Sequence, residues 1–470
     1  MFFHSLSSLF IFLPIFFLIY PLLQKINQTL SKVFLLNFSL IFYAFDIPWF
    51  IIPLLISSFS DFFLSKILIC QKNNSIIFRV LILIISFIVN LGLLLIFKYQ
   101  SLISYTFFNS NNNLLFNNLS NNFLPVGISF YTFQTLSFTI DSFKREIKKP
   151  PKLIDYLLFV SYFPQLVAGP ILRSCDFFSK DSELLLSKNK FNINLGLNRI
   201  CYGLFLKLCL ADELARLNDI AFQSDYNLLG FIDSWTMAFG FGLQIYFDFS
   251  AYSHIAIGIS RIIGLPIKEN FNFPYQSNSV TEFWKRWHIS LSSWVSDYLY
   301  RFLNKNLSLA FFGALPLLIT WLIMGMWHGA SWRFAIWGLI NGLLIIIHRA
   351  YKQKFIYQQN KLTNFLHWFL TLFSIMSTWI YFRSSSWEQA NTLFLKLFKF
   401  EGFELSFREN YYLFVFLFAI FTYIFGLISS QKIFNQIKNS KLLKNLLASF
   451  ALAFAIIFIN RQTSFIYFQF

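Results

Sequence analysis

The sequence predicts an all-α fold, a polytopic membrane helical bundle, on three observations. Of its 470 residues, 56% are hydrophobic and only 13% are charged, a balance that water-soluble domains of this length do not show. Apolar runs of about 18 or more residues recur, the length that a helix needs to cross the hydrocarbon core. The roughly ten-residue alternation of transmembrane β-strands is absent. We expect about ten to twelve transmembrane helices, with re-entrant or interfacial helices around a central funnel.

The two ends of the chain are predicted to be plain transmembrane regions. Residues 1–123 and 391–470 are expected to form N-terminal and C-terminal transmembrane helices on either side of a core, 124–390. The first apolar run, 2–23, has no Lys or Arg before it and no small-residue cleavage pattern after it, so we interpret it as a retained helix. The Asn-rich tract 109–122 is predicted to be an outer loop.

The charge of the chain is strongly positive, at +17 from 38 Lys and Arg against 21 Asp and Glu. These charges fall in short loops between apolar runs, for example "KREIKKPPK" at 144–152. Such a distribution is typical of the positive-inside bias and of attraction to anionic membrane lipids. We therefore expect a multi-pass protein of the cytoplasmic (inner) membrane with lipids, and no nucleic acid, as partners.

The middle of the chain, 153–350, differs from both ends. Its apolar stretches are broken by Gly, Pro and polar residues, as in "YFPQLVAGPILRS" and "QIYFDFSAYSHIAIG". Interrupted hydrophobic segments at membrane depth are tolerated only where they are buried in protein or line a watery cavity. We therefore expect the functional site in this region.

An amphipathic helix is predicted around His288. Ser279 and Glu282 have the spacing of a capping box, which predicts a helix start. One face would carry Trp284, Trp287, Leu291, Trp294, Tyr298 and Phe302, and the other Lys285, His288, Ser292 and Ser296. Such a helix either lies in the membrane interface, with Lys285 and Arg286 on lipid phosphates, or lines a polar cavity. An imidazole adds little to lipid anchoring, so His288 is a candidate site residue.

A second candidate is His328, in the stretch "MGMWHGASWRF" at 324–334. Between 307 and 347 only His328 and Arg333 can carry charge. If 307–327 is one crossing, the 14 residues 334–347 are too few for another, so part of "HGASWR" must enter the bilayer. An ionisable residue there is costly, which favours a functional histidine over a structural one. Arg333 could snorkel or hold a buried carboxylate, and the small Gly325 and Gly329 suit a tight turn, close helix packing or substrate approach.

The absence of the common catalytic and metal-binding motifs from the sequence favours imidazole chemistry. No nucleophile elbow, phosphate-binding loop, zinc-protease pair or dinucleotide fingerprint occurs, and the four cysteines lack zinc spacing, so no metal is expected. A neutral histidine in a low-dielectric pocket can take a proton from a hydroxyl as that hydroxyl attacks an activated carbonyl. Acyl transfer is a reaction that such a histidine can catalyse without a metal or a protein nucleophile.

Six sequence blocks, taken in order, resemble the membrane-bound O-acyltransferases, specifically the bacterial alginate and peptidoglycan O-acetylation branch. The blocks are "LPVGISFYTFQTLSFTID", "FPQLVAGPILR", "QIYFDFSAYSHIAIG", "NFNFPYQSNSVTEFWKRWHISLSSWVSDYLY", "MGMWHGASWRFAIWGLINGL" and "WIYFRSSSWEQA". The resemblance implies that His328 is the catalytic histidine and that His288 is its second polar partner inside the funnel. Relatives usually carry Gly at Ala251 and Asp at His254, so His254 is given no role.

The resemblance also implies a reaction. An acyl group, with acetyl favoured, would come from a cytoplasmic thioester donor, acetyl-CoA or an acyl carrier, without a bound cofactor. Lys285 and Arg286 are expected to hold the phosphates of that donor. Its destination would be a cell-envelope polysaccharide, peptidoglycan in preference to alginate, reached through an extracytoplasmic, esterase-like O-acetyltransferase partner. The alternatives are a transporter or flippase that moves an acyl donor or lipid-linked sugar without chemistry, and a structural membrane scaffold.

Overall fold

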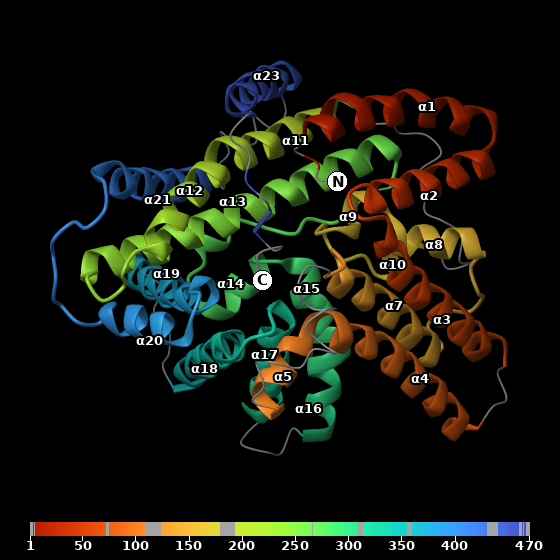
Figure 1. Cartoon of the computed structure of the whole chain (residues 1–470), viewed down its shortest axis with the longest axis horizontal. Helices are drawn as coiled ribbons and strands as arrows, with labels where there is room; N and C mark the ends of the chain where they lie inside the picture. Colours follow the sequence, from red (N-terminus) through yellow and green to blue (C-terminus); the bar gives the residue numbers. More distant parts are fainter. Residues whose placement is uncertain are drawn as a thin grey trace. The chain divides into compact units, whose positions relative to one another are not determined.

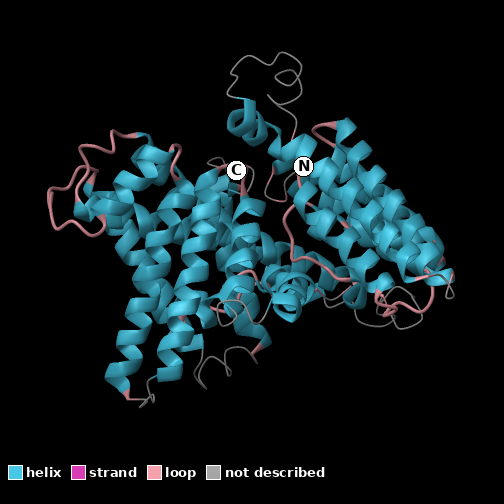
Figure 2. Cartoon of the chain, turned by 90° about the horizontal axis from the view of Figure 1, so that it is seen from below, coloured by secondary structure: helices cyan, strands magenta, loops and turns pink. Residues whose placement is uncertain are grey.

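The computed structural model describes residues 3, 5–71, 75–108, 124–178, 193–265, 267–307, 314–354, 360–429, 440–459, 463, 465 and 466. Within these ranges every element is a helix, and no strand occurs (Figure 2). The all-α fold class is therefore confirmed. The Asn-rich tract 109–122, the N-terminal His4 and the basic residues at 432–439 lie outside the described residues.

The chain divides into two compact units. The first comprises Met1–Leu197 and Ile255–Lys268, and the second Asn198–His254 and Glu269–Phe470. Two helices contribute to both units, α11 (Ile193–Phe205) and α13 (Phe231–Ile263). The division of the chain into 1–123, 124–390 and 391–470 stays a prediction.

The first unit holds the N-terminal helices (Figure 1). Its other elements are η1 (Ser8–Phe12), α1 (Leu13–Ile26), α2 (Gln28–Ala44), η2 (Pro48–Phe50), α3 (Ile51–Cys70), α4 (Ile76–Leu94), η3 (Leu95–Tyr99), α5 (Gln100–Phe108), α7 (Ile128–Phe143), α8 (Leu153–Ser161), α9 (Phe163–Leu166) and α10 (Ser174–Phe177). Helices α3, α4 and α7 pack together around buried polar groups. Asp61 accepts hydrogen bonds from Ser86 Oγ (2.6 Å) and Asn90 Nδ2 (2.8 Å), so its burial is compensated.

The second unit holds the two candidate histidines. Its other elements are η4 (Leu206–Ala211), α12 (Asp212–Gln223), η5 (Pro274–Gln276), α14 (Val280–Arg286), α15 (Ile289–Trp294), η6 (Val295–Tyr300), α16 (Arg301–Leu307), α17 (Ala314–His328), α18 (Trp332–Lys354), α19 (Lys361–Arg383), α20 (Trp387–Lys396), α21 (Glu409–Ser429) and α23 (Lys441–Phe458). Helices α17 and α18 pack at backbone contact, because a Cβ atom on Gly338 would lie 2.2 Å from the carbonyl oxygen of Trp321. A Cβ atom on Gly325 would likewise lie 2.2 Å from the carbonyl oxygen of Phe334, so close helix packing accounts for Gly325 and Gly338.

Seven helical segments among the described residues are long and apolar enough to cross a membrane. They are Ser8–Ile26, Pro48–Cys70, Ile76–Tyr99, Ile193–Gln223, Trp332–Lys354, Lys361–Arg383 and Lys441–Phe458. Three apolar helices are shorter, Leu153–Leu166, Ala314–His328 and Glu409–Ile424. The chain is therefore a polytopic helical bundle, and its described residues supply seven candidate crossings toward the ten to twelve predicted from apolar runs.

The two crossings predicted around His328 have different bounds in the structure. The described part of the first, α17, has 15 residues and ends at His328 itself. The second, α18, begins at Trp332 and continues to Lys354. It is therefore longer than the apolar run 334–347, because it includes residues before and after that run. Trp332 and Arg333 from "HGASWR" thus belong to a helix long enough to span.

Candidate active site

His288 lies at a break between two helices, where the sequence predicts one continuous helix. The predicted start is confirmed, since Ser279 Oγ accepts the Glu282 N–H (3.2 Å) at the beginning of α14. The helix ends at Arg286, however, and α15 begins at Ile289. His288 has a φ of +43°, in the left-handed region that a non-glycine residue seldom adopts and that occurs at functional sites.

The break changes the faces of the predicted amphipathic helix. His288 does not share a face with Lys285, because the left-handed turn sends the two side chains to different surroundings. The imidazole is buried, with 1% of its surface exposed, while Lys285 is exposed. Trp284, Trp287 and Trp294 are buried in the second unit, so they do not form an interfacial aromatic belt.

Asn270 holds the break in place from a loop before η5. Its backbone carbonyl accepts the Ile289 N–H (2.8 Å), and its side-chain Oδ1 accepts the Ser290 N–H (3.2 Å) and Ser290 Oγ–H (2.8 Å). Backbone donors that the helix break releases are thus satisfied. Sequence reasoning missed this residue; its only signal was its place at the start of the "NFNFPYQ" block.

The same Asn270 oxygen sets the proton position on His288. Asn270 Oδ1 lies 3.1 Å from His288 Nδ1, and it is identified as an oxygen because the backbone N–H of Ser290 donates to it. His288 Nδ1 therefore carries the hydrogen, and the neutral ring has its lone pair on Nε2. Burial lowers the pKa of His288 from its usual 6.5 to about 3, so the ring is neutral at pH 7.

His328 lies at the last position of α17 within an aromatic box. Its ring centroid is 4.9 Å from that of Trp327, 5.1 Å from Trp337 and 5.2 Å from Phe382, all in edge contacts. Only 6% of His328 is exposed. These rings come from α17, α18 and α19, so three helices fix the orientation of one imidazole and exclude bulk water from it.

Both histidines contact the same ring. The Trp327 centroid lies 6.5 Å from that of His288 and 4.9 Å from that of His328. The structure therefore brings together the two residues that the sequence singled out, within the second unit. Trp327 is a further member of the site that sequence reasoning did not assign.

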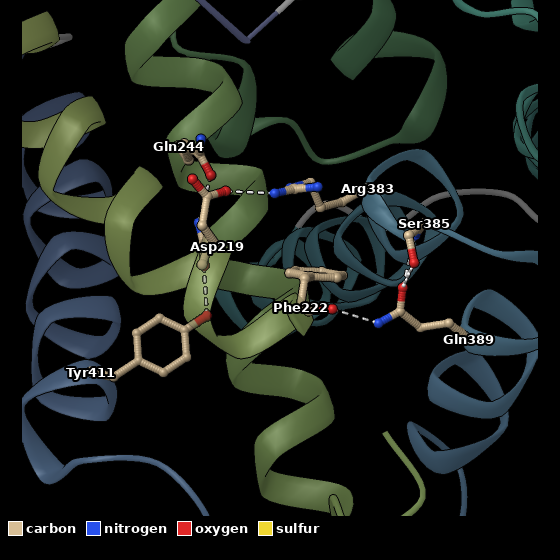
Figure 3. Close-up of polar contacts among 8 residues, drawn as sticks. Asp219, Phe222, Gln244, Arg383, Ser385, Gln389 and Tyr411 are labelled. Carbon is tan, nitrogen blue, oxygen red and sulfur yellow. Dashed lines mark hydrogen bonds and ion pairs between the residues drawn. The ribbon is translucent and has the colours of Figure 1, made fainter. Parts of the chain in front are cut away.

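Polar contacts anchor the end of α19 (Figure 3), the helix that supplies Phe382 to the box. The next residue, Arg383, pairs with Asp219 of α12 at 2.5 Å. Gln389 of α20 donates to the Phe222 carbonyl at 2.7 Å and accepts from Ser385 Oγ at 3.0 Å. Because these bonds tie the α19–α20 turn to α12, they restrict the movement of Phe382 against His328.

A cavity of about 190 Å³ lies near the aromatic box. It is lined by Thr281, Trp284, Lys285, Ser292, Val295, Ser296, Tyr300, Leu317, Thr320, Trp321, Met324, Ile345 and Arg349. Its wall residue Trp284 contacts Trp337 at 5.6 Å, and Trp337 contacts His328. Arg286 is not among these lining residues, and its guanidinium pairs with Glu282 at 2.5 Å.

Arg333 and His254 each contact an aromatic ring other than the rings of His288 and His328. The Arg333 guanidinium lies 5.8 Å from the Phe334 ring centroid, and within the described part of the chain no carboxylate pairs with it. His254 on α13 makes an edge contact with Tyr202 at 4.8 Å. Across the residues that the structure describes, no group of three or more His, Cys, Asp or Glu side chains is placed to hold a metal ion.

Comparison with known proteins identifies the family of the chain. The model of the membrane-bound O-acyltransferase family matches residues 104–387, a range that contains both histidines. The chain is 35% identical over 427 residues to a peptidoglycan O-acetyltransferase of Helicobacter pylori, an alignment covering 83% of this chain and 78% of that protein.

Two further relatives match a shorter part of the chain. A probable alginate O-acetylase of Azotobacter vinelandii is 39% identical over 283 residues, 60% of this chain and 55% of that protein. A teichoic acid D-alanyltransferase of Bacillus subtilis is 26% identical over 242 residues, 48% of this chain and 60% of that protein. With most of its length matched by the family model, the chain belongs to the membrane-bound O-acyltransferase family.

Proposed function

We propose that this enzyme moves an acetyl group from a cytoplasmic thioester donor to a hydroxyl on the outer side of the membrane, for O-acetylation of a cell-envelope polysaccharide. His328 acts as the general base. Its imidazole takes the hydroxyl proton while the oxygen attacks the thioester carbonyl, the C–S bond breaks, and the proton passes to the leaving thiolate. The products are an ester and a free thiol.

The observation that carries this proposal is the contact of both histidines with Trp327. Two buried imidazoles in one aromatic site, within the part of the chain that matches an acyltransferase family, supply a base and a neighbouring polar group. His288, neutral and held by Asn270, would orient the acceptor hydroxyl by accepting its hydrogen bond at Nε2. With its lone pair on Nε2, this ring cannot polarise the thioester carbonyl, which needs a hydrogen-bond donor. A dry site strengthens such polar interactions.

The cavity beside Trp284 supports a place for the donor. Lys285 and Arg349 bring two cations to it, and Thr281, Ser292, Ser296 and Thr320 bring hydroxyls. These groups fit the phosphates and amides of a thioester donor such as acetyl-CoA or an acyl carrier, while Trp321 and Met324 offer apolar contact to its arm. Arg286, occupied by Glu282, is not assigned to the donor.

The acceptor is proposed to be peptidoglycan in preference to alginate. The Helicobacter pylori peptidoglycan O-acetyltransferase aligns with 83% of this chain, whereas the alginate O-acetylase aligns with 60%. A separate extracytoplasmic, esterase-like O-acetyltransferase is the proposed partner that completes transfer to the polymer. The protein would work in the cytoplasmic (inner) membrane.

The test is release of free thiol from acetyl-CoA by the purified protein in proteoliposomes that contain a hydroxyl acceptor. We expect release by the wild type, and a loss of about 10²- to 10⁴-fold in His328→Ala. His367→Ala is the matched control, because that ring bonds to the Thr363 carbonyl on its own helix and is outside the site. A transporter would liberate no thiol, and a scaffold would tolerate replacement of both histidines.

A further inference from the structure

A buried cluster of three charges lies in the second unit, apart from the histidines. Lys207 Nζ is 2.8 Å from Asp212 Oδ1 and 2.9 Å from Asp248 Oδ1, and all three side chains are less than 5% exposed. Lys207 projects from the π-helical segment η4, Asp212 opens α12 and Asp248 lies on α13. One cation against two carboxylates leaves an excess of negative charge, which requires further hydrogen-bond donors.

Thr463 and Ile466, in the described part of the segment that also holds Phe465, supply those donors. Thr463 Oγ1 donates to Asp212 Oδ1 at 2.6 Å, and the Ile466 N–H donates to Asp248 Oδ2 at 2.7 Å. Each carboxylate thus receives one neutral donor in addition to Lys207. The segment is therefore fastened at two points to the charge cluster, and apolar packing is not its only attachment.

Between these two fastenings, Phe465 enters the protein interior. It is 1% exposed and its ring lies 5.2 Å from Tyr252 and 6.0 Å from Phe249. Phe249, which is fully buried, makes an edge contact with the His288 ring at 4.6 Å. Phe249 follows Asp248 directly on α13, so neighbouring residues hold the segment and contact the histidine.

We propose that Thr463, Phe465 and Ile466 act as a clasp that positions His288, with Phe465 as the positioning residue. The charge cluster fastens the clasp, and Phe465 keeps Phe249 packed against the imidazole. Without Phe465, a cavity opens beside Phe249, which can then rotate and admit water to the ring. The catalytic consequence rests on the proposed role of His288 in acyl transfer.

The experiment compares Phe465→Ala with Phe465→Leu, which retains much of the volume, in the purified full chain. Phe450→Ala, an exposed aromatic on α23, is the matched control. Two quantities are measured: the kcat and donor KM of thiol release, and the rate at which diethyl pyrocarbonate modifies His288, followed by mass spectrometry. Thr463→Val, which removes one fastening without opening a cavity, provides a second variant if Phe465→Ala does not fold.

We expect Phe465→Ala to lower kcat by about 10- to 100-fold at unchanged KM and to accelerate modification of His288. Phe465→Leu should bring kcat and the modification rate back toward the wild-type values. Thr463→Val should change the same two quantities to a smaller extent. Unchanged modification of His288 in Phe465→Ala and Thr463→Val overturns the clasp, whatever happens to activity. Accelerated modification at unchanged kcat leaves the clasp standing and contradicts the catalytic role of His288 instead.

Discussion

Asn270 and His288 are joined by one hydrogen bond that decides which nitrogen of the imidazole is basic. The 3.1 Å contact runs from His288 Nδ1 to Asn270 Oδ1, the same oxygen that receives the Ser290 N–H. Because Nδ1 carries the hydrogen, Nε2 is the nitrogen that offers a lone pair.

Asn270→Asp should move the pH profile of acyl transfer. A carboxylate at this position would stabilise the imidazolium and raise the pKa of His288, so the acidic limb of activity moves to higher pH. Asn270→Ala should instead lower kcat by about 10- to 100-fold, because the ring loses its orientation. Rate profiles of thiol release from pH 5 to 9 check both variants. Identical profiles for Asn270→Asp and wild type would contradict the assigned hydrogen bond.

His288 should make the protein sensitive to acid. Burial lowers its pKa to about 3 in the folded state, whereas the unfolded chain has the usual value of 6.5. Between these values the unfolded state binds the proton and the folded state does not, so this contribution to stability is complete above pH 6.5 and is lost as the pH falls toward 3.

The measurement is the Tm in detergent at pH 7 and pH 5 for wild type and His288→Gln. We expect the decrease in Tm between the two pH values to be smaller in His288→Gln, which cannot take up the proton. Protonation of Asp and Glu residues changes the Tm of both proteins equally, so this effect cancels when the two decreases in Tm are compared. An equal decrease in both would show that the ring is already accessible to protons in the folded state.

Gly338→Ala should separate α17 from α18. Its Cβ would lie 2.2 Å from the Trp321 carbonyl oxygen, a backbone atom that cannot move aside without the whole helix. We expect a destabilisation of about 1–3 kcal/mol and reduced activity, since His328 ends α17. Gly92→Ala on α4 is the control, because nothing lies within 4 Å of its added methyl. Equal Tm values for the two variants would argue against close packing at Gly338.

Lys285→Ala should weaken donor binding more than chemistry. The Lys285 side chain lines the cavity, and His328 is not among the residues that line it. We expect an increased KM for acetyl-CoA at nearly unchanged kcat, the pattern of a lost ground-state contact. Lys305→Ala, an exposed lysine of α16 outside the cavity, serves as control. A reduced kcat with constant KM would assign Lys285 to the reaction step.

Much of the architecture could be predicted from composition and length alone. Apolar runs near 20 residues predict membrane helices because the bilayer has a fixed thickness, and the spacing of Ser279 and Glu282 predicts the start of α14, which the structure confirms. The rarity of ionisable residues in such runs singled out His328, and the amphipathic pattern singled out His288. Their catalytic roles stay predictions.

Only the tertiary structure decided how those residues meet. The pattern of Trp284 to Phe302 favoured one helix, yet the chain breaks at His288, because the Asn270 loop satisfies the backbone donors that a break would leave unpaired. Contacts between Trp327 and the two imidazoles, and between Phe465 and Phe249, join positions far apart in the chain. Local periodicity contains no information on such pairs, since they depend on how separate helices pack.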